Sequence, residues 1–269
     1  ASRPYWEVLA RAVPRVERPG LFAAIYMGGG VLAFLAGFGV RALLGLDLPF
    51  PLGYALLFAL GTLAYGAAWY VFGRVEEPEE EVAVGRTDLR LPLRRPGFRA
   101  YLTARLFLGL AGMVEPFYAA YAVRVLGKEA ELGLYLALNA LAFILSNALW
   151  SALARRGAKA VFLGGGVLVL ATPLLALALP PGAFALVFFL QGAYLAALGI
   201  AGNTYLLNLA PPEERTATVG LANSFLGLFA FSPVLGGWVV GAWGYGALFL
   251  LSAGLAVLGL WAVRRLPEA

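Results

Sequence analysis

An acidic side chain inside a long apolar stretch is the strongest candidate for chemistry in this sequence. Glu115 is flanked by apolar residues on its N-terminal side and is followed directly by Pro116. An ionised carboxylate at the centre of a lipid bilayer costs about 2.5–3.5 kcal/mol, so a buried one usually faces a cavity or a partner. Two roles stay open for Glu115: binding a proton or a ligand, and packing or lining near the outer mouth. Pro116 removes a backbone donor and is expected to bend the helix there.

A basic residue precedes Glu115 in the same apolar stretch. Arg105 lies about one helical turn inside the stretch that begins near Tyr101. One interpretation is a guanidinium group that extends back to the membrane surface while its aliphatic stem stays in the apolar region. The alternative is an anion-binding residue in a central path.

Several uncharged polar residues also fall in apolar stretches. An unpaired amide in lipid is costly, so such residues form hydrogen bonds between helices or contact a ligand, and both roles stay open. Gln191, Tyr194 and Asn203 lie nearer the middle of their stretch and are the better cavity candidates. Tyr118 is expected to belong to an aromatic belt at the membrane interface. The further candidates are Asn139 and Asn223.

Missing residue types narrow the chemistry further. The sequence contains no Cys and no His, and its two Asp residues, Asp47 and Asp88, lie in predicted loops. This composition argues against thiolate or His-dependent catalysis, zinc sites and His-ligated haem. We therefore expect no enzyme activity, no metal and no cofactor. The net charge of +5 is dispersed over several loops, which favours lipid headgroups over nucleic acid as the counter-charge.

Eight apolar stretches organise the chain. Hydrophobic residues make up 61% of the sequence, far above the composition of a soluble domain. Each stretch approaches the ~20 residues that a helix needs to cross a bilayer, which predicts an all-α integral membrane protein with about eight transmembrane helices. The stretches are Leu21–Leu44, Leu52–Phe72, Tyr101–Val123, Gly133–Ala154, Val161–Leu179, Phe184–Leu209, Val219–Ala242 and Ala247–Val263. Small residues at every fourth position (Gly29, Ala33 and Gly37; Gly192 and Ala196) predict close helix packing.

The positive charges predict the orientation of these helices. Most of the 20 Lys and Arg residues lie in alternate connections: 1–20, 74–99, 155–159, 215 and 264–265. Because positive residues stay in the cytoplasm during insertion, we expect a multi-pass protein of the cell (inner) membrane with both termini cytoplasmic.

Four regions follow from these patterns. Residues 1–20 are expected to form an amphipathic segment at the inner interface, and residues 21–73 two transmembrane helices. Residues 74–97 are the one long polar interval and are expected to form a cytoplasmic linker. Residues 98–265 then form a compact group of six helices joined by short connections.

The six-helix group resembles the C-terminal half of the major facilitator superfamily, a large class of secondary transporters. Its opening helix contains Phe98-Arg99-Ala100-Tyr101-Leu102 and Glu115-Pro116-Phe117-Tyr118. Residues 150–159 (WSALARRGAK) are similar to the family's G-x-L-A-D-R-x-G-R-R loop, although no Asp stands beside the arginines. Residues 211–215 (PPEER) and 232–237 (SPVLGG) are similar to its P-x-E-x-R turn and its G-P-x-x-G-G kink.

The resemblance implies roles for particular residues. It makes Arg155, Arg156, Gly157 and Lys159 candidates for a cytoplasmic gating loop. It makes Pro233, Gly236 and Gly237 candidates for a helix kink, beside the kink expected at Pro116.

The resemblance also implies a fold and a function. Residues 1–73 would correspond to the last two helices of the family's N-terminal half, so the bundle would lack the first four helices. The implied function is transport of a small solute by alternating access, with proton-coupled efflux as one form of it. The alternative is a truncated helical module that transports nothing unless it pairs with the missing helices or another chain. The expected partners are the lipid bilayer and a small solute. An ion gradient, with protons as one candidate ion, and the solute gradient alone both stay open as the source of energy.

Overall fold

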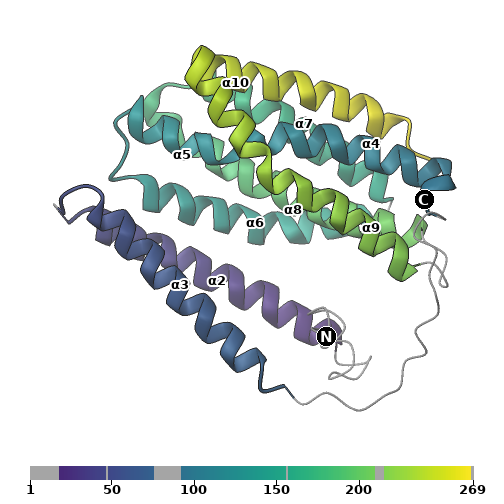
Figure 1. Cartoon of the computed structure of the whole chain (residues 1–269), viewed down its shortest axis with the longest axis horizontal. Helices are drawn as coiled ribbons and strands as arrows, with labels where there is room; N and C mark the ends of the chain where they lie inside the picture. The colour runs from purple at the N-terminus through teal and green to yellow at the C-terminus, as the bar shows by residue number, and fades with distance from the viewer. Residues whose placement is uncertain (1–17, 47, 76–91, 156, 210–214, 268–269) are drawn as a thin grey trace.

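The computed structural model describes residues 18–46, 48–75, 92–155, 157–209 and 215–267, and every element in these ranges is helical (Figure 1). The all-α fold class is thus confirmed. Several expected features lie outside the described residues. They are most of the amphipathic segment 1–20, most of the linker 74–97, Arg156 and residues 211–214. The α-helices are α2 (Arg18–Leu44), α3 (Leu52–Phe72), α4 (Pro96–Ala111), α5 (Glu115–Arg124), α6 (Leu132–Ala154), α7 (Ala158–Ala178), α8 (Ala185–Leu209), α9 (Arg215–Gly227) and α10 (Ser232–Arg264). Short 3₁₀ helices are η1 (Pro92–Arg94), η2 (Gly112–Val114), η3 (Pro181–Ala183) and η5 (Leu228–Phe231).

Six helical runs within the described residues are long and apolar enough to cross a membrane. They are Leu52–Phe72, Pro96–Arg124, Leu132–Ala154, Ala158–Ala178, Pro181–Leu206 and Ala217–Arg264, and Gly28–Leu44 is a shorter apolar helix. A helix satisfies its own backbone hydrogen bonds, which is what a spanning segment in lipid requires. The chain is therefore a multi-pass membrane protein, and the number of about eight crossings stays a prediction.

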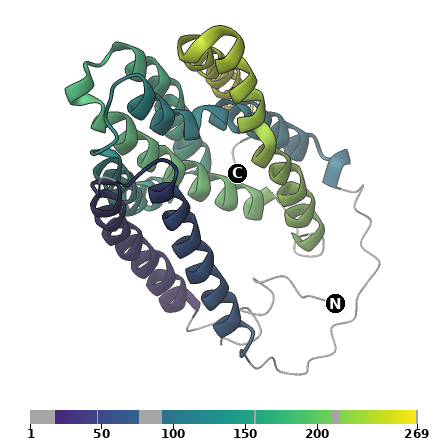
Figure 2. The ribbon, with the colours of Figure 1, turned by 60° about the vertical axis from the view of Figure 1, so that its left-hand side comes forward.

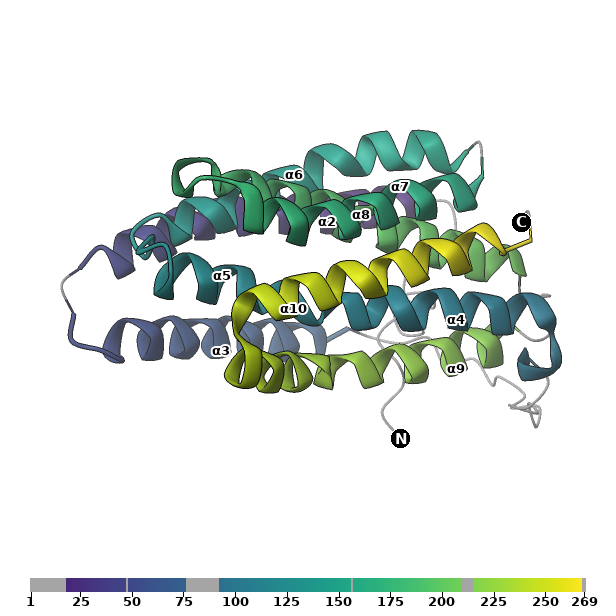
Figure 3. The same cartoon turned by 90° about the horizontal axis from the view of Figure 1, so that it is seen from above.

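The longest run, Ala217–Arg264, contains a sharp turn. Gly244 has φ 82° and ψ 175°, which lies outside helical geometry and is readily adopted only by glycine. Figures 1 and 3 show the chain reversing its direction near this turn, so that the second part of α10 runs back along the bundle. The turn falls within the short connection 243–246 that the sequence suggested between two apolar stretches.

Two aromatic clusters form the core of the bundle. In the first, the rings of Tyr101 and Tyr205 stack at 5.8 Å, which joins α4 to α8. In the second, the rings of Tyr118 and Phe249 lie 5.6 Å apart and join α5 to α10. Tyr118 is fully buried, so its expected place in an interfacial belt is wrong. The burial arises because the second part of α10 covers this face of α5.

The α2–α3 hairpin lies on one side of the six-helix group (Figures 1 and 2). Helix α2 packs along α6, and the backbones approach closely where Gly37 faces Gly133 and Ala137. No atom lies within 4 Å of where a Cβ on Gly29 would be, and Ala33 is exposed. Of the three small residues expected to pack closely in this helix, only Gly37 therefore lies against α6. Helix α3 is exposed along almost its whole length.

Candidate functional site

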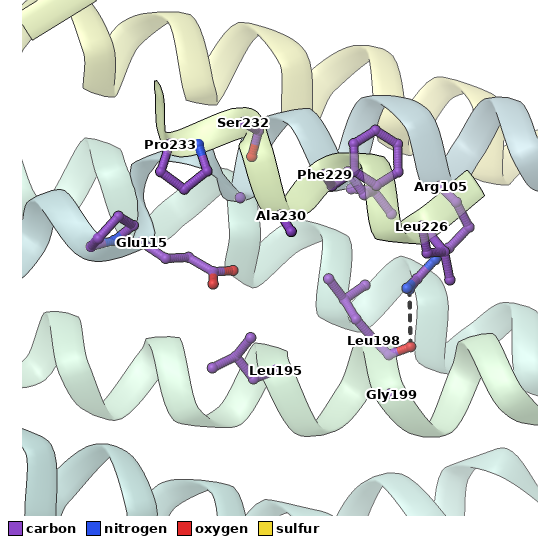
Figure 4. A pocket seen from close by; sticks show the side chains of 14 residues that line it. Arg105, Glu115, Leu195, Leu198, Gly199, Leu226, Phe229, Ala230, Ser232 and Pro233 are labelled. Carbon is purple, nitrogen blue, oxygen red and sulfur yellow. Dashed lines mark hydrogen bonds between the residues drawn. The ribbon is translucent and has the colours of Figure 1, made fainter. Parts of the chain in front are cut away.

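A cavity of about 460 Å³ opens between three helical segments of the six-helix group. This volume falls in the range of small-molecule sites. We call it the Arg105–Glu115 cavity after the two charged residues in its wall (Figure 4). The first wall, from α4 to α5, contains Arg105, Leu108, Gly109, Gly112, Glu115 and Pro116; the second, from α8, contains Leu195, Leu198 and Gly199; the third, from α9 to α10, contains Leu226, Phe229, Ala230, Ser232 and Pro233.

The guanidinium group of Arg105 lies against α8. Its Nη1 atom donates a hydrogen bond to the backbone oxygen of Leu198 at 3.2 Å (Figure 4). Its Nε atom is buried and has no hydrogen-bond partner among the described residues. Gly202 leaves room for this guanidinium group, because a Cβ at that position would lie 3.2 Å from Nη1 and the group would have to shift slightly. Arg105 therefore lines the cavity wall, and its anion-binding role stays a prediction.

The carboxylate of Glu115 lies at the opposite end of the same wall. Its Oε1 atom accepts a hydrogen bond of 3.4 Å from the hydroxyl group of Tyr194 on α8. The hydroxyl group of Tyr118, one turn further along α5, is buried without a hydrogen-bond partner in the described part of the chain. Glu115 also occupies the first turn of α5, where the helix dipole favours a negative charge.

Two helix interruptions flank the cavity. The 3₁₀ segment η2 separates α4 from α5 immediately before Glu115 and Pro116. The 3₁₀ segment η5 separates α9 from α10 immediately before Pro233. Proline is tolerated in the first turn of a helix because its missing N–H group needs no partner there. The two interruptions thus lie in facing walls of the same cavity.

Glycines allow the walls to approach each other. A Cβ on Gly109 would lie 2.6 Å from the ring of Phe229, so α4 and η5 could not pack this closely around a larger residue. A Cβ on Gly236 would lie 2.7 Å from the ring of Phe117. Gly237 has only an ordinary contact with that ring, at 3.8 Å. Gly236 and Gly237 both lie in the regular part of α10, beyond the interruption at η5.

The remaining polar candidates lie outside the cavity wall. Asn139 donates a hydrogen bond of 3.1 Å to the backbone oxygen of Phe188, which joins α6 to α8. Gln191 is partly buried, whereas Asn203 and Asn223 are exposed. The structure therefore places Arg105 and Glu115 in the wall of one cavity, and Tyr194 contacts Glu115 through its hydroxyl group.

The gating-loop candidates lie at the connection between α6 and α7. Arg155 is exposed, and Gly157 has φ 139°, a conformation that favours glycine. Lys159 donates a hydrogen bond of 2.7 Å to the backbone oxygen of Leu266 after the end of α10. This connection is thus tied to the C-terminal end of the last helix.

Two contacts and one open position near the site were not predicted from the sequence. Ser252 of α10 donates a buried hydrogen bond of 2.7 Å to the backbone oxygen of Ala111, just before η2. Trp150 donates one of 2.9 Å to the backbone oxygen of Ala193 on α8. Gly199 lines the cavity with no atom within 4 Å of its would-be Cβ. Serine and glycine are common in such helices, so no local signal distinguishes these positions.

Comparison with known proteins gives one family match. A family model described as Major Facilitator Superfamily matches residues 107–269, which include Glu115 and two of the three cavity walls. Neither a search of curated proteins nor a search of solved structures gives a match. No group of three or more Asp, Glu, Cys or His side chains comes together in the ranges that the structure describes.

Proposed function

Because the chain belongs to the Major Facilitator Superfamily, we propose that it carries a small solute across the membrane by alternating access through the Arg105–Glu115 cavity. This family consists of transporters rather than enzymes, which agrees with the expectation of a protein without catalytic activity. The single observation that carries the proposal is the cavity itself: a space of small-molecule size, with two charged residues, inside a bundle of apolar helices.

The wall structure supports movement of this site. Alternating access requires helices that change their course near the bound solute. The interruptions η2 and η5 lie beside the cavity, and both replace regular α-helical hydrogen bonds with a short 3₁₀ segment. A rocking movement would therefore change the cavity without disrupting the long packed helices α6, α7 and α8.

A plug in the cavity tests the proposal. Gly199 lines the cavity and has open space where a Cβ would lie, so Gly199→Trp should place a large side chain in the path. Gly254 on α10 also has open space but does not line the cavity, so Gly254→Trp is the matched control. We expect Gly199→Trp to abolish uptake of a broad solute panel into proteoliposomes and Gly254→Trp to retain it. Equal uptake by the two variants would contradict the proposal.

Proton coupling is part of the proposal and rests on Glu115. It is the acidic residue of the cavity wall, and Tyr194 contacts its carboxylate. We expect Glu115→Gln to remove the dependence of transport on an imposed pH gradient. Tyr118→Phe serves as the control, because it deletes a neighbouring hydroxyl group without changing charge. Transport by Glu115→Gln that still follows the pH gradient would exclude Glu115 from coupling. The mostly apolar residues between the two charges favour an amphiphilic solute, and we propose efflux as the direction of transport.

We also propose that the chain lies in the inner membrane with both termini in the cytoplasm, on the basis of its arginine distribution. The sequence contains no Cys, so a single introduced cysteine would be the sole site of labelling. Ala130→Cys should react with a membrane-impermeant maleimide from outside intact cells, and Arg94→Cys should react only after the membrane is opened. The reverse pattern would invert the topology.

A second proposal concerns the other side of the path. No residue of α2 or α3 belongs to the described wall of the cavity, and α3 exposes large apolar residues such as Phe58, Leu63 and Tyr65. These observations favour the alternative that the chain transports only after pairing with further helices or another chain. Uptake by liposomes that contain this chain alone, at a protein density too low for pairs, would refute this alternative.

A further inference from the structure

The two charged residues of the Arg105–Glu115 cavity are separated and do not neutralise each other. They lie on the same helical wall, and ten residues of helix correspond to a rise of about 15 Å. No ion pair joins them, although both belong to the described residues. Most side chains that lie between these ends, among them Leu195 and Leu198, are apolar, and the hydroxyl group of Ser232 is the uncharged polar group of the described wall (Figure 4). The wall thus presents a positive end, an apolar middle and a negative end.

From this arrangement we infer that the cavity binds an amphiphile with an anionic group at one end and a protonated amine at the other. The inference rests on the proposed function, since it names the chemical class of the solute carried through the same cavity. A ligand of this class compensates both charges, whereas a purely anionic or cationic ligand leaves one side chain without a counter-charge.

The Arg105 end is suited to a carboxylate or phosphate group. A guanidinium group has five N–H donors in a planar arrangement that matches such anions with two parallel hydrogen bonds. In this structure one donor is used by the backbone oxygen of Leu198, and the buried Nε atom has no partner. No carboxylate of the described residues forms an ion pair with Arg105, so an anionic group of the ligand can supply the counter-charge.

The Glu115 end is suited to a protonated amine. An ionised carboxylate can accept about four hydrogen bonds. Glu115 accepts one from Tyr194, and at 3.4 Å that contact is long for an O–H···O bond. An ammonium group brings three donors and the compensating charge to the same place. Figure 4 shows the Glu115 side chain extending into the space beside Leu195 rather than away from it.

Three eight-carbon probes test the two ends separately. 8-Aminooctanoate carries both charges, octanoate carries the anion alone, and octylamine carries the cation alone. Binding to the purified full chain in detergent would be measured by isothermal titration calorimetry. Hydrogen bonds to charged groups support an expected affinity for 8-aminooctanoate at least about tenfold higher than for either single-charge probe.

Variants assign each end to its residue. Arg105→Gln should weaken 8-aminooctanoate and octanoate about tenfold or more and leave octylamine unchanged. Glu115→Gln should weaken 8-aminooctanoate and octylamine to a similar extent and leave octanoate unchanged. Gly199→Trp should weaken all three probes, and Gly254→Trp none. Unchanged elution and melting temperature of each variant would show that it is folded.

Equal affinities for the three probes, or variants that weaken all three alike, would overturn the inference. Binding that survives Gly199→Trp would also overturn it, because the probes would then occupy another site. Proteoliposome flux separates this result from the proposed function. If the chain carries a singly charged or neutral solute and Gly199→Trp blocks this flux, the proposal of transport stands and the inference about the ligand class fails. If the chain binds 8-aminooctanoate selectively but shows no flux, the inference about the ligand class stands and the proposal of transport fails.

Discussion

Replacing Gly192 by alanine should weaken the packing of α8 on α6. Gly192 faces the backbone of α6, where a Cβ would lie 2.9 Å from the carbonyl carbon of Asn139 and 3.0 Å from the nitrogen of Phe143. Backbone atoms in the middle of a helix cannot rotate away as a flexible side chain can. The two helices would therefore have to separate by a few tenths of an ångström or more, and α8 carries one wall of the Arg105–Glu115 cavity.

The magnitude follows from comparison with a second glycine in the same helix. Overpacking by one carbon typically costs about 1–3 kcal/mol. The gain in helix propensity from Gly to Ala, about 0.5–1 kcal/mol, applies to any glycine inside a helix. Gly199 has no atom within 4 Å of its would-be Cβ, so Gly199→Ala keeps the gain without the clash. The difference in unfolding free energy between the two variants is thus the clash alone, about 1–3 kcal/mol.

Reversible unfolding in mixed detergent and SDS micelles, followed by tryptophan fluorescence, measures this difference. We expect Gly192→Ala to unfold at a lower SDS fraction than Gly199→Ala. Solute uptake should fall with Gly192→Ala as well, because the displaced α8 changes the cavity wall. Equal unfolding midpoints for the two variants would refute the close approach of α8 to α6 on which the reasoning depends.

Three further changes have expected outcomes. Ser252→Ala removes a buried hydrogen bond to a backbone oxygen of α4 and should cost about 0.6 kcal/mol, and at most about 1.7, in the same unfolding assay. Gly37→Val should separate α2 from α6, because a Cβ at Gly37 would lie 2.7–2.8 Å from atoms of α6. Gly39→Val is the control, because no atom lies within 4 Å of a Cβ at Gly39, and cysteine cross-linking between the two helices would detect the difference. Lys128 donates a hydrogen bond of 2.8 Å to Glu131, which lowers the pKa of Glu131 and raises that of Lys128. The contribution of this pair is therefore lost as the pH falls through the lowered pKa of Glu131, or rises through the raised pKa of Lys128. Lys128→Gln should raise the pKa of Glu131 in an NMR titration, and an unchanged pKa would contradict the contact.

The sequence located the membrane-embedded helices well because their signal is local. A run of about twenty apolar residues is a property of the chain itself, and a helix is the form that satisfies its backbone in lipid. The stretch Leu52–Phe72 has the same bounds in the sequence and in the structure. Glu115 and Arg105 also stood out locally, because charged residues are costly in such a run.

Other assignments depended on neighbours that are distant in the sequence. Tyr118 resembled an interfacial residue but is buried by α10, more than a hundred positions further along the chain. The amides Asn203 and Asn223 are exposed and lie outside the wall of the Arg105–Glu115 cavity, so a role for them in solute contact stays a prediction. A position inside an apolar stretch gives depth along the helix, whereas the direction in which the side chain points depends on the packing of other helices.

The sequence by itself thus determined that this chain is an all-helical membrane protein with a carboxylate and a guanidinium group in one apolar helix, and its motifs pointed to the major facilitator superfamily. Only the tertiary structure decided that Arg105 and Glu115 line one cavity, that α8 supplies their partners Leu198 and Tyr194, and that Gly199 leaves its space open. The physical reason is that hydrophobicity acts on each segment separately, while a cavity exists only where side chains from several packed helices leave a gap.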